Sequence, residues 1–387
     1  MTPRSILPGA TLGVMGGGQL GRMFVQAAQA MGYFTAVLDP DVTSPAGLVA
    51  HYHIEADYLD EQGLAQLMQR SAAITTEFEN VPAGALVTLG AHRPVAPTAD
   101  AVAVCQDRAS EKAQFRRSGI PCAPFALIDT PERLAAVPDS LLPGILKTAR
   151  LGYDGKGQAV VADRAALAAA WDALGQVPCV LEQKLPLALE LSVVVARSAS
   201  GDVVQLPVQQ NLHRGGILAV TQVPAPDASA ALQAQAAASA AQLATDLHYV
   251  GVLCVEFFVT TDGQLVANEM APRPHNSGHW SIDGADISQF DLQVRTLCGL
   301  PLVAPRQHSA AVMLNLLGDL WFGTDGRERA PPWAPVLALP GVHLHLYGKA
   351  SARPGRKMGH LTVTAATAEA ARATALQAAA LLGLPGF

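Results

Sequence analysis

The strongest constraint on the fold is a hairpin signal in the second half of the chain. Two apolar runs, 250–260 and 264–270, are separated by the pair Asp262-Gly263. Such a pair between apolar runs is a strong signal for a β-hairpin, because both central residues of its tight turn take positive φ. The sequence therefore predicts two antiparallel strands here, followed by the polar run 271–279.

The register of this hairpin brings two carboxylates together. With the turn centred on the Asp-Gly pair, Phe258 is expected opposite Ala267, and Glu256 opposite Glu269. Like charges directly opposite each other destabilise a sheet, so a cation should lie between them. Oxygen ligands at that separation suit Mg2+, which proteins hold through one or two carboxylates while substrate phosphates complete its shell. The alternative is a solvated face with two unrelated glutamates, but the neighbours on that face are apolar: Val252, Cys254, Phe258 and Ala267.

Composition limits the class of protein. With 387 residues, 50% of them hydrophobic and 15% charged, the chain can form two or three domains with packed cores. A net charge of -6 without a basic block indicates neither a nucleic-acid partner nor a membrane partner. The five scattered cysteines lack C-x-x-C spacing and indicate buried thiols. Because neither a signal-peptide pattern nor an apolar stretch of about 20 residues is present, we expect a cytoplasmic protein.

The N-terminal region carries a glycine-rich pattern. An expected strand at 12–15 leads into Gly16-Gly-Gly-Gln-Leu-Gly21, a helix at 22–31, and a strand at 34–38 that ends at Asp39. Taken alone, this is the G-x-G-x-x-G fingerprint of a dinucleotide-binding Rossmann unit. The same glycines also suit any sharp strand-to-helix turn, where the helix N-terminus binds other phosphates. A further strand at 74–76 presents Glu77 to Asn80 at the edge where open α/β sheets bind ligands.

The middle of the chain contains a lysine inside an apolar strand. Lys147 lies in the expected strand 144–149, and a lysine in such surroundings requires an anionic partner. The loop 150–157 contains three glycines and leads to a strand at 158–162. Its backbone amides could cover phosphates as a flap, although it lacks the G-x-x-x-x-G-K-[ST] sequence of a Walker A loop.

Periodicity and end signals indicate further elements. Strands are expected at 180–185, 189–196, 311–316, 342–346 and 361–364, and helices at 110–117, 227–247, 288–298 and 368–382. The basic turn before the last strand fits either a phosphate site or a solvated loop, and its cations are Lys349, Arg353, Arg356 and Lys357.

Motifs along the whole chain resemble the ATP-grasp superfamily and, within it, the family of ATP-dependent carboxylases that form N5-carboxyaminoimidazole ribonucleotide. The motifs are GQLGR at 18–22, TEFEN at 76–80, GYDGKGQ at 152–158, NLH at 211–213, NEMAPR at 268–273, HNSGHW at 275–280 and RPGRKMGH at 353–360. The resemblance implies an α/β ATP-grasp fold. It also implies a Rossmann-like preATP-grasp domain at 1–108, a two-part ATP-grasp domain at 109–304 and a small C-terminal domain at 305–387.

The activity that this resemblance implies is that of an ATP-grasp ligase in purine biosynthesis. Its substrates would be ATP, bicarbonate and 5-aminoimidazole ribonucleotide, and its products N5-carboxyaminoimidazole ribonucleotide, ADP and phosphate. Because bicarbonate is a poor electrophile, ATP would first convert it into carboxyphosphate. The amine of the ribonucleotide would then attack this intermediate or the CO2 released from it. The family further implies Mg2+, with Mn2+ as an alternative, and a homodimer.

The same resemblance assigns the ATP and metal sites. The metal ligands would be Glu256 and Glu269. The adenine edge would be 182–185, with Glu190 on the ribose and His213 beside the nucleotide. The residues expected around ATP are Arg108, Lys147, Gly152, Tyr153, Asp154, Gly155, Lys156, Gly157, Gln158, Glu182, Gln183, Lys184, Leu185, Glu190, His213, Asn268 and Glu269.

A second set of residues is expected to bind bicarbonate and the ribonucleotide. This set is Gln19, Glu77, Tyr153, Asp154, Arg273, His275, Asn276, Ser277, Lys349, Arg356 and Lys357. The catalytic residues implied among them are Asp154, Arg273, His275, Asn276 and Lys357. Asp154 would orient the amine or accept its proton. The guanidinium fork of Arg273 suits a planar carboxylate.

Three alternatives compete with this interpretation. A zinc site on His275 and His279 fits their spacing, but Asn-Ser-Gly between them is a poor helix and the glutamate of H-E-x-x-H is absent. An NAD-dependent oxidoreductase would explain the N-terminal glycines but not the middle of the chain. A sibling ligase, such as the formate-dependent glycinamide ribonucleotide transformylase, would differ in its use of formate instead of bicarbonate.

Overall fold

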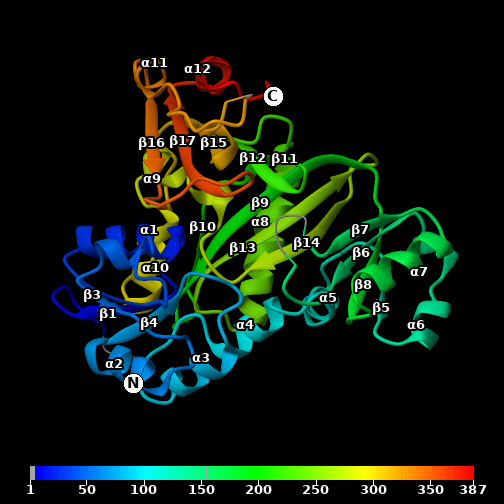
Figure 1. Ribbon diagram of the computed structural model, residues 1–387, viewed down its shortest axis with the longest axis horizontal. Coiled ribbons are helices and arrows are strands. Elements are labelled where there is room, and N and C mark those ends of the chain that lie inside the picture. The colour runs from blue at the N-terminus through cyan, green and yellow to red at the C-terminus, as the bar shows by residue number, and fades with distance from the viewer. Residues whose placement is uncertain (1–4, 153–155, 324) are drawn as a thin grey trace.

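The computed structural model describes residues 5–152, 156–323 and 325–387. Within that part of the chain the strands form three sheets, which belong to an N-terminal domain, a small lobe and a large sheet (Figure 1). In Figure 1 the N-terminal domain lies at lower left, the lobe at right and the C-terminal strands at the top.

The N-terminal domain is a parallel sheet in the order β3-β2-β1-β4. Leu12 and Val14 of β1 pack with Phe24 of α1 on one face, whereas Met15 packs with Leu64 of α2 on the other. Because successive side chains of β1 point to opposite faces of the sheet, this one strand contributes to the apolar cores on both faces. The elements are β1 (Thr11–Met15), α1 (Gln19–Ala30), β2 (Phe34–Leu38), the 3-10 helix η1 (Gly47–Val49), β3 (Tyr52–Ile54), α2 (Glu61–Arg70), β4 (Ala73–Thr76), α3 (Ala83–Gly90) and α4 (Ala99–Cys105).

The lobe is a sheet in the order β5-β8-β6-β7, joined to the N-terminal domain through α5. Leu146 and Leu181 from its central strands pack against Trp171 of α7. Lys147 alternates with Leu146 and so points from β6 to the opposite face. The elements are α5 (Arg108–Arg117), β5 (Phe125–Ile128), α6 (Pro131–Ala135), η2 (Asp139–Leu141), β6 (Gly144–Thr148), β7 (Gln158–Val161), α7 (Arg164–Ala173) and β8 (Cys179–Gln183).

The large sheet has the order β14-β13-β9-β11-β12-β15-β17-β16, with β10 paired to β9. Its first part contains β9 (Leu187–Arg197), β10 (Val203–Gln205), β11 (Gln209–Arg214), β12 (Ile217–Val223), α8 (Ala230–Asp246), β13 (Gly251–Thr260), β14 (Leu265–Ala271), η3 (Asn276–Gly278), α9 (Ser281–Gly284) and α10 (Gln289–Cys298). Its second part contains β15 (Ala310–Leu317), η4 (Gly318–Trp321), α11 (Trp333–Leu337), β16 (Val342–Leu346), β17 (Lys357–Ala365) and α12 (Ala368–Leu382).

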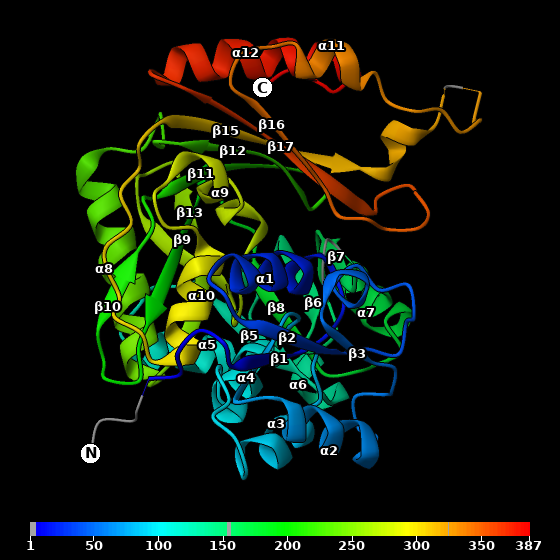
Figure 2. The same ribbon diagram turned by 90° about the vertical axis from the view of Figure 1, so that its left-hand side faces the viewer.

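This sheet continues across the domain boundary expected at 304/305. Strand β12 pairs with β15, with Val220 opposite Leu314. Helix α12 covers the C-terminal strands, as the red helix above them shows in Figure 2. The C-terminal segment thus adds strands to an existing sheet and encloses its own apolar layer.

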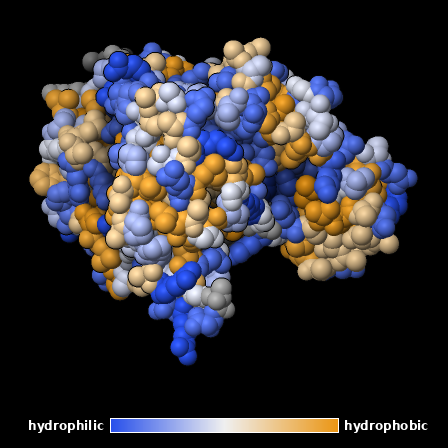
Figure 3. Space-filling view, turned by 90° about the horizontal axis from the view of Figure 1, so that it is seen from above, coloured by the Kyte–Doolittle hydropathy of each residue, from blue (hydrophilic) through white to orange (hydrophobic). Residues whose placement is uncertain are grey.

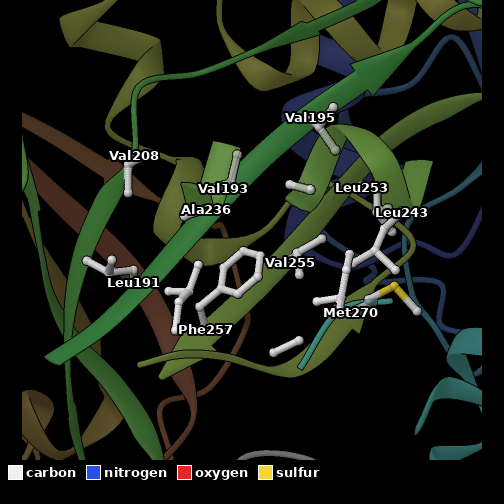
Figure 4. Close-up of a cluster of buried hydrophobic side chains, with 14 of the residues drawn as sticks. Leu191, Val193, Val195, Val208, Ala236, Leu243, Leu253, Val255, Phe257 and Met270 are labelled. Carbon is white, nitrogen blue, oxygen red and sulfur yellow. The ribbon is translucent and has the colours of Figure 1, made fainter. Parts of the chain in front are cut away.

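The main core lies between the large sheet and α8. Leu191, Val193 and Val195 of β9 lie beside Phe257, Val255 and Leu253 of the neighbouring strand β13 in this cluster (Figure 4). The alternate residues of β13, Val252 and Cys254, are buried on the other face of the sheet. Glu256 follows them on that second face, since side chains two apart point the same way.

The hairpin that carries Glu256 differs from the expected one in two ways. Its loop is one residue longer, because the amide of Thr260 donates to the carbonyl of Gln264 at 2.9 Å and Gly263 alone adopts a positive φ of 83°. This is the turn expected for a three-residue hairpin loop, in which the glycine takes the left-handed position. Phe258 consequently pairs with Val266, and its expected pairing with Ala267 is wrong.

A β-bulge then restores the register at the carboxylates. The pairing shifts between Glu256 and Phe257, leaving Asn268 as the extra residue of β14. Glu256 therefore lies opposite Glu269, which confirms that predicted pair.

None of the helices in residues 5–152, 156–323 and 325–387 has the length and apolarity that a membrane span requires.

Candidate active site

Three adjoining cavities lie where the lobe, the N-terminal domain and the large sheet meet. The first, of about 260 Å³, lies between the lobe and β13–β14, and the second, of about 100 Å³, shares Arg108, Glu256 and Glu269 with it. The third, of about 600 Å³, shares Arg273 and Lys357 with the second. In a space-filling view, a hollow with hydrophilic residues separates the lobe at right from the main body (Figure 3).

The paired carboxylates form the wall between the first two cavities. Glu256 is 8% exposed, and its Oε1 has no hydrogen-bond partner in the described part of the chain. Burial and the adjacent Glu269 raise the pKa of Glu256 to about 8. Burial also favours protonation of Glu269, but Arg108, whose Nη1 lies 3.0 Å from Oε2, and Lys147 outweigh it and lower that pKa. Opposed oxygen ligands with a buried, unsatisfied oxygen fit a divalent cation.

The buried lysine has the anionic partner that its sequence context requires. Nζ of Lys147 lies 3.0 Å from Oε2 of Glu182, while Nζ of Lys112 lies 3.1 Å from Oε1 of the same carboxylate. Burial favours the neutral form of Glu182, but the two ammonium groups outweigh it and lower the pKa. Lys112 also donates to the carbonyl of Asn268 at 2.8 Å, so it connects the lobe with the hairpin. Sequence reasoning did not identify Lys112.

The far end of the first cavity presents groups suited to a nucleoside. Gln183, Lys184 and Leu185 lie at the end of β8. Across the cavity, Nδ1 of His213 is paired with the carboxylate of Glu190. Burial lowers the pKa of His213, but the hydrogen bond to Glu190 and the nearby carboxylates outweigh it, and the net pKa is raised.

The flap is only partly described. Gly152 lines the second cavity, and Lys156 and Gln158 line the first. The amide of Thr148 donates to the carbonyl of Gly157 at 2.8 Å, which places that glycine at the base of the flap. The predicted site residues Tyr153, Asp154 and Gly155 lie outside the described residues.

Arg273 and His275 face the second cavity from the loop after β14. Both Nε and Nη2 of Arg273 donate to Oε2 of Glu79, at 3.1 and 2.6 Å. Nε2 of His275 lies 3.6 Å from Oε1 of Glu256. Burial, together with Arg273, lowers the pKa of His275, so the imidazole is neutral. The sequence placed Glu79 at the expected ligand-binding end of the strand 74–76, but it did not predict its pairing with Arg273.

Two residues of that loop are not on a cavity wall. Ser277 is fully buried, and its hydroxyl contacts Ser192 Oγ at 2.8 Å and His275 Nδ1 at 2.9 Å. Asn276 is also buried, and it lines none of the three cavities described here. Ser277 thus supports the loop from behind, whereas Nδ2 of Asn276 is buried without a hydrogen-bond partner in the described part of the chain.

The third cavity is lined by the cations of the basic turn. Lys349, Arg353, Arg356 and Lys357 face Gln19 and Glu77 of the N-terminal domain across it. Hydrogen bonds to η4 hold this turn in place. The amide of Gly318 donates to the carbonyl of Arg356 at 2.8 Å, and Gly355 donates to Asp319 Oδ2 at 2.7 Å. The four cations thus gather on one wall of the third cavity, an arrangement that suits an anion.

Glu77 excludes a dinucleotide from the Rossmann-like turn. Its two carboxylate oxygens accept hydrogen bonds from the amides of Gly18 and Gly21 at 3.1 and 3.2 Å, at the start of α1. These amides are the ones that would bind a pyrophosphate. A carboxylate of the chain already satisfies them and would repel phosphates, so the NAD-dependent alternative fails.

The histidines near the site do not form a zinc centre. Nδ1 of His279 contacts Gln289 at 2.9 Å, whereas His275 faces Glu256, so the two rings do not converge. Asp283, His345 and His360 bring ligand atoms within 4.8 Å of one another. The rings of His345 and His360 are, however, stacked at 4.5 Å with 13° between their planes. Imidazole lone pairs lie in the ring plane, so these two do not meet at one ion in this arrangement.

Family models match the chain in three consecutive stretches. The Ribonucleotide synthetase preATP-grasp domain matches residues 9–106, and the ATP-grasp domain matches residues 113–290. The Phosphoribosylaminoimidazole carboxylase C-terminal domain matches residues 311–374. These matches confirm the expected ATP-grasp fold.

Individual proteins are similar over nearly their full lengths. The chain is 45% identical over 366 residues to the N5-carboxyaminoimidazole ribonucleotide synthase of Brucella melitensis, covering 94% of this chain and 98% of that protein. The Staphylococcus aureus N5-carboxyaminoimidazole synthetase complexed with ADP superposes with a TM-score of 0.89 at 37% identity, covering 98% of each chain. The Aspergillus clavatus synthase in complex with ADP and 5-aminoimidazole ribonucleotide superposes with a TM-score of 0.87 at 30% identity, covering 99% of this chain and 100% of that one.

Proposed function

Because this chain belongs to the N5-carboxyaminoimidazole ribonucleotide synthase family, we propose that each of its three cavities binds one substrate of the ATP-dependent carboxylation of 5-aminoimidazole ribonucleotide. The chain is an ATP-grasp ligase of purine biosynthesis. The observation that carries the proposal is the order of the cavities, since neighbouring cavities share Arg108, Glu256 and Glu269 at one wall and Arg273 and Lys357 at the other.

ATP occupies the first cavity in this proposal. Its adenine lies against Gln183 to Leu185, its ribose near Glu190 and His213, and its phosphates near Arg108 and Lys147. Phosphoryl transfer needs positioning and charge neutralisation more than covalent help, and these cations supply both. Of the predicted flap, Gly152, Lys156 and Gln158 line the cavities beside the phosphates, where a cover would keep water from the reacting groups.

The carboxylate pair is the proposed metal site. Glu256 and Glu269 would hold Mg2+, with Asn268 beside them, and Mn2+ is the alternative ion. When bound, the cation neutralises charge on the transferring phosphoryl group. Arg108 holds Glu269 at 3.0 Å, and the protein thereby orients one of the two carboxylates in advance.

Bicarbonate occupies the second cavity, beside the end of the phosphate chain. The guanidinium of Arg273 is held in place by Glu79 and offers its remaining donors to the planar anion. Burial and Arg273 favour the neutral imidazole of His275, so the cations that line this cavity are Arg108, Arg150, Arg273 and Lys357. The oxygen of bicarbonate attacks the γ-phosphate here to give carboxyphosphate, while Ser277 supports the loop.

The ribonucleotide occupies the third cavity. Lys349, Arg356 and Lys357 bind its phosphate, and Gln19 and Glu77 lie across from them near the ribose or amine. Lys357 lines both this cavity and the second one, so the amine can approach the activated carboxylate directly. Asp154 stays the predicted group that orients the amine or accepts its proton.

The direct test is the dependence of ADP formation on bicarbonate. With ATP, Mg2+ and 5-aminoimidazole ribonucleotide, the protein is expected to form ADP in proportion to added bicarbonate and to form none above background in CO2-free buffer. Formate with glycinamide ribonucleotide should support no turnover. Turnover that is indifferent to bicarbonate would assign the chain to the sibling ligase instead.

The His213–Glu190 pair predicts a pH dependence of nucleotide affinity. The raised pKa keeps the imidazolium to higher pH, so affinity for ATP is present below that pKa and weakens as the pH rises through it. Glu190→Gln removes the largest group that raises the pKa, and the loss should then begin at lower pH. Calorimetric titrations with ATP across the pH range measure this. Glu132→Gln, a change on the distant lobe surface, serves as the control, and an unshifted profile in Glu190→Gln would contradict the assignment.

The homodimer is a prediction from the family resemblance, and the cytoplasmic location is a prediction from the sequence, which has neither a signal-peptide pattern nor a long apolar stretch. A homodimer would give a light-scattering mass of twice 40.3 kDa. A cytoplasmic location agrees with a reaction whose substrates are small charged metabolites.

A further inference from the structure

We propose that Gln289, which does not line any of the three cavities described here, positions the loop bearing His275 so that the activated carboxylate is transferred rather than lost to water. This inference rests on the proposed function, because it concerns the bicarbonate cavity. It assigns Gln289 no contact with a substrate, so it is a positioning residue.

The side-chain amide of Gln289 pairs with the backbone of His275. Its Oε1 accepts a hydrogen bond from the amide of His275 at 2.9 Å, and its Nε2 donates to the carbonyl of His275 at 2.8 Å. A neighbouring β-strand would satisfy the same two groups in the same way. Gln289 is 0% exposed, so these bonds are sheltered from water.

The same residue also fixes the far end of the loop. Nε2 of Gln289 lies 2.9 Å from Nδ1 of His279, and its backbone amide donates to Ser281 Oγ at 3.1 Å. The loop backbone passes so close that a Cβ on Gly278 would meet Oε1 of Gln289 at 2.4 Å. One buried residue at the start of α10 thus holds both ends of residues 275–281, the first through its side-chain amide and the second through its backbone amide.

The loop has little structure of its own to hold it. Between β14 and α10 it contains only the single-turn helices η3 and α9 among the described elements. The position of His275 therefore depends on side-chain contacts such as those with Gln289 and Ser277. Without Gln289, the amide of His275 would lose its partner and the carbonyl would keep only the amide of Gly278 at 3.0 Å, so the loop would have to move to satisfy the amide.

A small movement here affects one reaction step more than the others. His275 and Arg273 line the second cavity, whereas the groups around the nucleotide lie on α5 and on β6, β8, β9, β11, β13 and β14. Loss of the amide pairing should therefore leave ATP binding intact while misplacing the bicarbonate groups. Carboxyphosphate formed in a misplaced site reaches water, so ADP accumulates without carboxylated product.

The experiment compares three variants for the ratio of carboxylated ribonucleotide to ADP, with the KM for ATP and the melting temperature recorded alongside. Gln289→Glu keeps the shape and the acceptor but replaces the donor to His275 with a carboxylate oxygen. Gly278→Ala adds a Cβ on the loop that would collide with Oε1 of Gln289, and it thereby disturbs the same pairing. Gln210→Leu is the matched control, because Gln210 likewise bonds to one residue twice, to the backbone and side chain of Asp227 at 2.9 and 2.7 Å, and lines none of the three cavities.

Gln289→Glu and Gly278→Ala are each expected to lower the product-to-ADP ratio by about tenfold, with an unchanged KM for ATP. Gln210→Leu should lower the melting temperature and keep the ratio. A wild-type ratio in both test variants would overturn the proposal, even if their melting temperatures fall. If the wild-type protein itself shows no bicarbonate-dependent ADP formation, the proposed function fails, and that result is distinct from failure of the Gln289 inference.

Discussion

Replacing Glu269 with Gln is expected to lower the kcat for bicarbonate-dependent ADP formation by about 10³-fold. The substitution removes one of the two opposed carboxylates and leaves Arg108, 3.0 Å away, without its ion-pair partner at the wall between the nucleotide and bicarbonate cavities. The proposed cation would lose a charged ligand, and the remaining charge distribution would no longer match the transferring phosphoryl group. Steady-state ADP release at saturating ATP measures the effect.

Asp262→Asn is the matched control for this change, because it also converts a carboxylate into an amide on the same hairpin. Asp262 is exposed and accepts hydrogen bonds from Thr260 and Gln264 within the turn. Such surface changes cost little stability, so turnover should stay near the wild-type value. If Glu269→Gln behaved like Asp262→Asn, the carboxylate pair would have no part in phosphoryl transfer.

Replacing Arg273 with Lys is expected to lower the rate of carboxylation by about 10²-fold at an unchanged KM for ATP. Arg273 uses Nε and Nη2 on Glu79 and Nη1 on the carbonyl of Pro274, and it keeps one further N–H on each of Nη1 and Nη2 for the anion. An ammonium has no such fork, so it cannot hold Glu79 and bicarbonate in the same fixed geometry. Product formation at varied bicarbonate concentration separates a loss of affinity from a loss of kcat.

Arg306→Lys provides the comparison, since Arg306 pairs with Asp286 at 3.4 Å on the exposed surface. Exposed ion pairs contribute little, so this variant should retain its activity. A fully active Arg273→Lys protein would remove bicarbonate recognition from the guanidinium of Arg273 and leave it to the other cations that line the second cavity, Arg108, Arg150 and Lys357.

Much of the fold could be predicted where local pattern and final environment agree. The strands at 34–38 and 342–346 and the helix at 368–382 have the expected bounds. Strand β11 was not expected, because Gln209–Arg214 is polar by sequence, although it pairs with neighbours on both sides. Its Asn211 and His213 line the nucleotide cavity, and a strand built for a polar site lacks the apolar alternation of an ordinary buried strand.

In the candidate site too, features that depend on neighbouring residues could be predicted, whereas contacts between residues distant in the sequence could not. The hairpin register predicted that Glu256 lies opposite Glu269, and the apolar strand around Lys147 predicted an anionic partner for this lysine. The structure shows the first pair and gives Lys147 its partner in Glu182. The roles of Lys112 and Gln289 and the pairing of Glu79 with Arg273 were not predicted, because the partners Glu182, His275 and Arg273 lie elsewhere in the sequence. Only the folded arrangement relates them.

The longer turn and the bulge of the β13–β14 hairpin limit how this segment can change length in evolution. Each irregularity alone would slip the pairing by one residue, and a slip of one turns a side chain to the opposite face of the sheet. A deletion in the turn without loss of the bulge would therefore separate Glu256 from Glu269, whereas a paired change at both places would keep them together. Viable insertions and deletions between residues 256 and 269 should occur as compensated pairs, so that gaps in this hairpin are correlated across related sequences.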